Sequence, residues 1–157
     1  MSGTLVQSLI AHLDSVFAGP NGDYAAVLEA TANVSASQAL WKPAMSRNSI
    51  WQIVEHLIAS KEWLIDMLER GQANPPVWIN PSGDEVAWQA ALAQLKKAHL
   101  RLKQVLNRLE DEDLLKVPNH EDGLTLLELI LSAGSAHDAH HSGQIDYLKG
   151  LQLAERE

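Results

Sequence analysis

Residues 49–71 read SIWQIVEHLIASKEWLIDMLERG, and this stretch carries the clearest structural signal in the sequence. Its large apolar residues recur every three or four positions, which is the spacing of one face of an α-helix. Asn48 and Ser49 are both of a type that caps a helix N-terminus, and Gly71 is of the type that ends a helix. The stretch therefore predicts a long amphipathic helix from Ile50 to Arg70 that buries one face.

Three further long helices are predicted outside this stretch. They run from about Thr4 to Ala18, from Asp84 to about Leu109, and from about Thr125 to Leu151. The last one begins with a capping box, because Thr125 is followed three residues later by Glu128. Four long amphipathic helices predict an all-α fold, a four-helix bundle, formed by a single domain that spans residues 1–157.

The connections between these helices differ in length. Two short helical pieces are expected near residues 28–30 and 38–41, the first of them capped by Asp23. Residues 72–81 hold three of the six prolines and predict a long surface connection that could cover a site. Residues 110–113 are all acidic and predict a loop. The predicted bundle therefore has long connections.

Charge and composition exclude several classes of function. The chain has 12 Lys and Arg residues against 20 Asp and Glu residues, and the resulting net charge of −8 would repel a nucleic-acid backbone. The first residues lack the basic flank of a signal peptide, and no apolar run approaches the roughly 20 residues of a membrane span. We therefore expect a cytoplasmic protein with neither nucleic-acid nor membrane partners. Because the chain has no cysteine, a transition-metal site must use histidine and carboxylate ligands.

Three histidines lie in residues 136–144, which read AHDAHHSGQ within the last predicted helix. Residues four apart on an α-helix lie one above the other, so His137 and His141 can offer two nitrogens to one metal ion. Both also lie seven residues from positions of the apolar stripe and should point inward. His140 lies three residues from His137 and is the alternative partner, although its own stripe is less apolar. We therefore predict His137 and His141 as metal ligands.

A third ligand has to come from another helix. His12, His56 and His99 each lie on the apolar side of a predicted helix, and their spacing does not choose among them. A lone histidine on an apolar face is more often a hydrogen-bonded core residue than a metal ligand. The pair on the last helix differs, because two buried neutral imidazoles in contact need partners, which a metal ion supplies.

Three local patterns follow one another along the chain. Residues 38–43 read QALWKP, residues 49–57 read SIWQIVEHL, and residues 137–145 read HDAHHSGQI. In this order they resemble the DinB family, a group of metal-binding four-helix bundles that includes YfiT-like proteins. The second pattern resembles the family block with one histidine ligand, and the third resembles the block with two. The resemblance implies that the metal ligands are His56, His137 and His141.

The resemblance covers residues 5–151, with one departure directly before the second quoted pattern and one within the third. Asn48 stands where similar sequences often have a histidine, and Ser142 stands where a basic residue is usual. Neither position is one of the implied ligands. The expected fold is therefore a four-helix bundle of the DinB and YfiT-like type.

The resemblance also implies a metal and a class of function. The expected cofactor is a divalent ion, Zn²⁺ or Ni²⁺, with Fe²⁺ or Mn²⁺ as alternatives, because imidazole suits several metals. Three histidine ligands leave an open position, as in catalytic sites. Family members include hydrolases and transferases that use low-molecular-weight thiols, so we expect a small-molecule substrate such as a cellular thiol, and a homodimer. The alternative is a non-catalytic dimeric bundle that its metal stabilises.

No catalytic residue is assigned by the sequence. Gln144 is one candidate for a supporting role, because it lies seven residues after His137 and three after His141. It would either orient a water or substrate in the site or serve as a structural amide bonded to a neighbouring helix.

Overall fold

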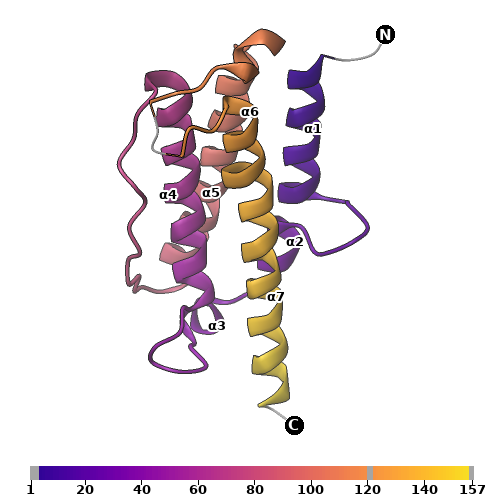
Figure 1. Ribbon diagram of the computed structural model, residues 1–157. Helices are drawn as coiled ribbons and strands as arrows, with labels where there is room; N and C mark the ends of the chain where they lie inside the picture. The colour runs from indigo at the N-terminus through magenta and orange to yellow at the C-terminus, as the bar shows by residue number, and fades with distance from the viewer. Residues whose placement is uncertain (1–3, 120–121, 156–157) are drawn as a thin grey trace.

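Four long helical segments lie side by side in the computed structural model (Figure 1), which describes residues 4–119 and 122–155. They are α1 (Leu5–Ala18), α4 (Ile50–Arg70), α5 (Glu85–Leu106) and a last segment that ends in α7 (His137–Ala154). The described residues contain no β-strand. None of the helices in these ranges has both the length and the hydropathy needed to cross a membrane. The predicted all-α bundle is confirmed.

Helix α4 begins and ends at the residues that its sequence predicts. The Oγ of Ser49 accepts a hydrogen bond from the backbone N–H of Gln52 at 3.2 Å, and the Gln52 side chain accepts one from the backbone N–H of Ser49 at 3.0 Å. This reciprocal pair satisfies two N–H groups at the helix start. Gly71 ends the helix in the left-handed conformation, with a φ of 71°. Ser49 is therefore the cap, and Asn48 lies outside the helix.

The last helical segment changes its winding partway along. It begins as α6 (Leu126–Leu129), which Thr125 caps as predicted, and continues as the π-helical segment η2 (Ile130–Ala136) before α7. A π-helical turn contains more residues than an α-helical turn, and such turns are frequent at functional sites. The predicted helix is therefore present, but it is not α-helical throughout, and η2 lies directly before the first histidine of α7.

Shorter elements fill the connections, and two of the predictions made for them are wrong. Helices α2 (Val27–Thr31) and α3 (Ala36–Leu40) follow α1, and a 3-10 helix, η1 (Asp111–Leu115), follows α5. Asp23 does not cap α2, because that helix begins after Ala26. The acidic residues are not a loop, because the Asp113 carboxylate accepts the Glu110 backbone N–H at 2.9 Å and starts η1.

Residues 72–84, between α4 and α5, contain no helix and run along the outside of the bundle (Figure 1). We call this segment the strap. The side-chain amide of Gln52 donates hydrogen bonds to the carbonyl oxygen of Ile79 at 3.1 Å and to Oδ1 of Asn80 at 2.8 Å. These bonds hold the strap against α4, so the long connection predicted from the prolines has a fixed position.

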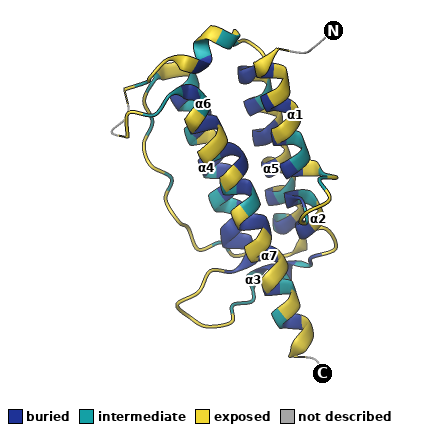
Figure 2. Cartoon of the chain, turned by 45° about the vertical axis from the view of Figure 1, so that its right-hand side comes forward, coloured by how far each residue is buried: buried dark blue, intermediate teal, exposed yellow. Residues whose placement is uncertain are grey.

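Buried residues lie along each of the long helices (Figure 2). Their apolar side chains form two clusters. The boundary between the clusters falls between Leu13 and Phe17 on α1, between Ile58 and Leu64 on α4, and between Ala98 and Leu102 on α5. Polar residues lie in these intervals and on α7. We use the name polar layer for four ionisable residues at this level of the bundle, Asp14, Lys61, His99 and Asp138. The bundle therefore has a charged middle between two apolar halves.

Candidate metal centre

His137 and His141 lie on the same face of α7, as their spacing predicts. Their ring centroids are 4.4 Å apart, and His141 is 5% exposed. His140 is exposed beside them. Gly134, one turn before His137, provides the space for a neighbouring helix, because a Cβ at this position would lie 2.8 Å from the Leu13 side chain of α1. The pair therefore faces the bundle at a point where α1 packs closely against the last helical segment.

Helix α4 brings His56 to the same point. The Nε2 atom of His137 lies 3.0 Å from Nε2 of His56 and 3.1 Å from Nε2 of His141. One nitrogen from each ring lies within 4.8 Å of the others. We call these three residues the histidine triad. Of the other two candidates for a third ligand, His12 is exposed and His99 is bonded to an aspartate elsewhere in the bundle.

The spacing of the three nitrogens fits a shared metal ion. A tetrahedral Zn²⁺ with Zn–N distances of about 2.0–2.1 Å holds its nitrogen ligands about 3.3 Å apart. Hydrogen bonds among the rings explain the cluster less well, because a neutral ring nitrogen carries either one proton or one lone pair. The Nε2 atom of His137 nevertheless faces two other rings, and the Nδ1 atoms of His56 and His137 have no hydrogen-bond partner within the described residues. The donor set fits one divalent ion.

Gln144 fixes the proton of one triad ring. Its Oε1 atom lies 2.7 Å from Nδ1 of His141, and its Nε2 atom lies 3.1 Å from Nε2 of the exposed His140. Because an amide oxygen only accepts hydrogen bonds, the proton of the neutral His141 ring is on Nδ1. The lone pair is then on Nε2, which faces the other two histidines. Gln144 thus acts through His141 and bonds within its own helix, whereas the sequence suggested either contact with a water or substrate or a bond to a neighbouring helix.

Removal of this amide tests its role. We expect Gln144→Ala to weaken Zn²⁺ binding by about 10- to 100-fold, the usual cost of removing a hydrogen-bond partner of a metal ligand. Gln144→Glu should restore most of the affinity, because a carboxylate also accepts the Nδ1 proton. Competition with a chelator of known affinity measures the effect. The control is Gln152→Ala, which removes a buried α7 amide bonded to the Gln38 carbonyl and should leave Zn²⁺ affinity unchanged; equal losses in both alanine variants would contradict the role.

The triad histidines are held in the neutral form. Burial, with the neighbouring His141 and His56 acting in the same direction, lowers the pKa of His137 to about 3. Burial and His141 lower the pKa of His56 to about 4, and burial lowers the pKa of His141 as well. A metal ion requires the deprotonated imidazole nitrogen, so the site does not have to release protons before binding at neutral pH.

These shifts make the metal-free protein sensitive to acid. The unfolded chain binds protons at an ordinary histidine pKa of 6.5, whereas the folded chain resists them down to about 4 at His56 and about 3 at His137. Unfolding therefore takes up protons, and stability is expected to fall as the pH drops below about 6.5. Urea midpoints at pH 7 and pH 5, in the presence of a chelator, measure the loss. The loss of stability between pH 7 and pH 5 should be smaller in the His56→Ala/His137→Ala variant than in the wild type, and it should be unchanged in His12→Ala. A loss in the double variant as large as that of the wild type would refute the explanation.

An aromatic residue of the strap covers the triad. The Trp78 ring stacks on His56 with a centroid distance of 4.0 Å and an interplanar angle of 8°, and it meets His141 edge-on at 6.0 Å. This contact is not predicted from the sequence, although a tryptophan within a proline-rich connection is unusual for an exposed segment. Trp63 lines the cavity beside His56, whereas Trp51 belongs to the buried core.

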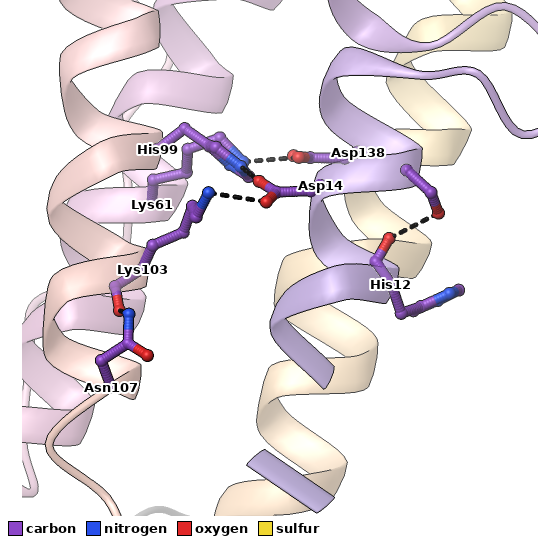
Figure 3. Close-up of polar contacts among 8 residues, drawn as sticks. His12, Asp14, Lys61, His99, Lys103, Asn107 and Asp138 are labelled. Atoms are coloured by element: carbon purple, nitrogen blue, oxygen red, sulfur yellow. Dashed lines mark hydrogen bonds and ion pairs between the residues drawn. The ribbon is translucent and has the colours of Figure 1, made fainter. Parts of the chain in front are cut away.

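The polar layer lies beside the triad and is shown in Figure 3. Lys61 Nζ lies 2.5 Å from Oδ2 of Asp138, and both side chains are only 1% exposed. Across the bundle, Nε2 of His99 lies 2.9 Å from Oδ1 of Asp14, whose other oxygen pairs with Lys103 at 2.6 Å. The burial of Lys61 is not predicted from the sequence, because a lysine on the edge of an apolar stripe is usually exposed.

His99 has a structural role in this layer. Its ring stacks on Phe17 at a centroid distance of 3.8 Å, and burial lowers its pKa. We expect His99→Ala to lower the free energy of unfolding by about 2 kcal/mol, through lost packing and a lost hydrogen bond to a carboxylate. Metal content, measured by elemental analysis, should stay at the wild-type level. A loss of metal as large as that of His56→Ala would show that His99 is the true third ligand.

Comparison with known proteins identifies the family of the chain. A family model described as the DinB superfamily matches residues 22–145, a range that includes all three residues of the histidine triad. Among curated proteins and solved structures, none matches the chain significantly. The matched range covers well over half of the sequence, and the chain therefore belongs to the DinB superfamily.

Proposed function

We propose that the protein binds one divalent metal ion through His56, His137 and His141 and uses it to transfer a low-molecular-weight thiol to an electrophilic small molecule. The observation that carries this proposal is the convergence of three neutral Nε2 atoms beside a cavity. Zn²⁺ and Ni²⁺ both suit three imidazole ligands. Held there, the ion supplies an open coordination position and lowers the pKa of the group that occupies it.

Thiol transfer suits the surroundings of the triad better than hydrolysis does. Hydrolysis profits from a general base that takes a proton from water. Asp138, the acidic residue next to His137, is paired with Lys61, and Asp122 at the cavity is exposed. A thiol needs less help, because its ordinary pKa of about 8.5 is far below the 15.7 of bulk water. The chain's own residues then have to bind and orient the thiol and keep water away, which the stacked Trp78 and the strap do on one side of His56.

The proposed reaction balances without an oxidant or a reductant. The thiolate sulfur forms a bond to an electrophilic carbon of the second substrate. The bond from that carbon to its leaving group breaks, and the leaving group departs with the electron pair. The proton that the thiol gave up goes to solvent or to the leaving group.

The test compares thiol transfer with hydrolysis in one preparation. Protein loaded separately with Zn²⁺ and Ni²⁺ is mixed with 1-chloro-2,4-dinitrobenzene and a panel of thiols, and in parallel with p-nitrophenyl esters and amides. We expect thiol-dependent release of chloride that His137→Ala abolishes. Ester or amide hydrolysis without thiol transfer would overturn the proposal in favour of a hydrolase. A metal-loaded protein that is inactive in both assays would overturn it in favour of a metal-stabilised bundle without catalysis.

We also propose that the protein forms a homodimer. The support for a dimer is the set of large apolar and aromatic side chains exposed on the surface, among them Val77 of the strap, which is 74% exposed, and Tyr147 of α7, which is 68% exposed. Light scattering after size-exclusion chromatography measures the mass in solution. A mass of one chain at micromolar concentration would refute this part of the proposal.

A further inference from the structure

A cavity of about 320 Å³ lies beside the histidine triad. His56, Ser60 and Trp63 line it from α4, because residues four and seven positions apart share one face of a helix. His137 lines it from α7, and Pro75 and Pro76 close it from the strap. The two triad histidines in this lining make the cavity the approach to any ion that the triad holds.

Ser60 carries a buried hydroxyl that has no hydrogen-bond partner in the described part of the chain. It is 5% exposed, and its Oγ atom forms no hydrogen bond within the described residues. Two other buried helix hydroxyls bond to a carbonyl one turn earlier, Thr31 to Val27 at 2.8 Å and Ser135 to Leu131 at 2.9 Å, and Ser142 bonds to the carbonyl of Ala25. An unpaired buried hydroxyl costs free energy, so a partner is expected. The cavity that Ser60 lines is the place where a ligand could supply that partner.

The charges around the cavity disfavour an anionic ligand group. Among the described residues that line it, none is Lys or Arg, and Asp122 contributes a carboxylate at its exposed edge. Lys61 follows Ser60 in the sequence, but its ammonium group is paired with Asp138. Among the described lining residues, a substrate carboxylate would meet no lysine or arginine and would lie near the like charge of Asp122.

We infer that this cavity selects the class of thiol: the part of the substrate next to the sulfur is a short uncharged chain that carries a hydroxyl or amide group for Ser60. The inference rests on the proposed function, because it places the sulfur at the triad. Ser60 is then a specificity-determining residue. Trp63, Pro75 and Pro76 form apolar walls, and the methylene groups of the substrate pack against them.

Three thiols with the same two-carbon chain test the inference. Ethanethiol, 2-mercaptoethanol and 3-mercaptopropionate are titrated into protein loaded with Co²⁺, and thiolate coordination is followed by its near-ultraviolet absorption. We expect 2-mercaptoethanol to bind about fivefold more tightly than ethanethiol, as one additional net hydrogen bond would give. The carboxylate of 3-mercaptopropionate should make it the weakest ligand, and Asp122→Asn should raise its affinity.

Variants of Ser60 separate this inference from the proposed function. Ser60→Ala should remove the preference for 2-mercaptoethanol, whereas Ser60→Thr, which keeps the hydroxyl, should retain it. The matched control is Ser135→Ala, which removes an equally buried serine that is bonded to its own helix and should keep the preference. An unchanged preference in Ser60→Ala, or equal binding of the two neutral thiols by the wild type, overturns the inference alone. Bound Co²⁺ without thiolate absorption from any thiol overturns the proposed function.

Discussion

The His141→Ala variant is expected to leave purification with almost no bound metal, whereas the wild type carries close to one ion per chain. His141 supplies a neutral Nε2 whose lone pair is fixed by the proton on Nδ1, and the two remaining imidazoles cannot replace it. Loss of a ligand should cost more than the 10- to 100-fold that loss of a ligand's hydrogen-bond partner costs, so we expect a decrease in affinity of more than about 100-fold. Elemental analysis of protein made without a histidine tag measures it.

The control for this experiment is on the same helix. His140→Ala removes an exposed imidazole one residue away, whose ring centroid lies 5.1 Å from that of His141. It should keep the wild-type metal content, apart from the small effect of releasing Gln144. His56→Ala should lose metal as His141→Ala does, although the two residues lie on different helices. Wild-type metal content in His141→Ala would mean that the triad does not hold the ion.

Lys61→Met is expected to lower the free energy of unfolding by about 3–5 kcal/mol. The substitution leaves the Asp138 carboxylate buried and without its counter-ion, and that is the usual cost of breaking a buried ion pair. The second carboxylate oxygen of Asp138, Oδ1, already lacks a hydrogen-bond partner in the described part of the chain. Few other contacts can therefore compensate for the loss of the Lys61 charge. Chemical denaturation in urea at pH 7, with metal removed from all samples, measures the change.

Two comparisons make this prediction specific to the buried pair. The Lys61→Met/Asp138→Leu variant removes both charges and should recover most of the lost stability, because desolvating two charges nearly cancels their attraction. Arg108→Met breaks an ion pair with Glu69 in which Arg108 is 70% exposed, and it should cost less than about 1 kcal/mol. A loss in Lys61→Met no larger than that in Arg108→Met would show that the pair contributes no more than a surface contact.

The sequence predicts the helices of this fold well because their ends depend on neighbouring residues. The α4 helix starts at a serine whose cap partner is three residues away and ends at a glycine with positive φ, so local chemistry determines both ends. The inward pair on α7 likewise follows from spacing along one helix. The prediction fails at α2, where Asp23 is a residue of the type that caps helices but lies three residues before Ala26, the actual cap position.

The third residue of the triad could not be chosen from spacing. His56 and His99 both lie on the apolar side of a long helix, and only the resemblance to the DinB family favoured His56. The structure shows the physical difference: His99 has Asp14 as a partner, 85 residues away in the sequence, whereas His56 reaches His137, 81 residues away. Partners of this kind depend on tertiary packing, as do Lys61 with Asp138 and Trp78 with His56.

The π-helical segment η2 has a consequence for how the chain tolerates length changes. A bond from residue i to i+5 accommodates about one residue more per turn than the α-helical bond to i+4. Deleting one residue from 130–136 can therefore convert the segment to α-helix while the downstream faces keep their direction. A deletion between His137 and His141 cannot be absorbed in this way, because this part of the helix has no extra residue in its turns. Such a deletion rotates one imidazole about 100° away from the other. Length variation among related chains should then accumulate before the first histidine of α7 and be excluded after it.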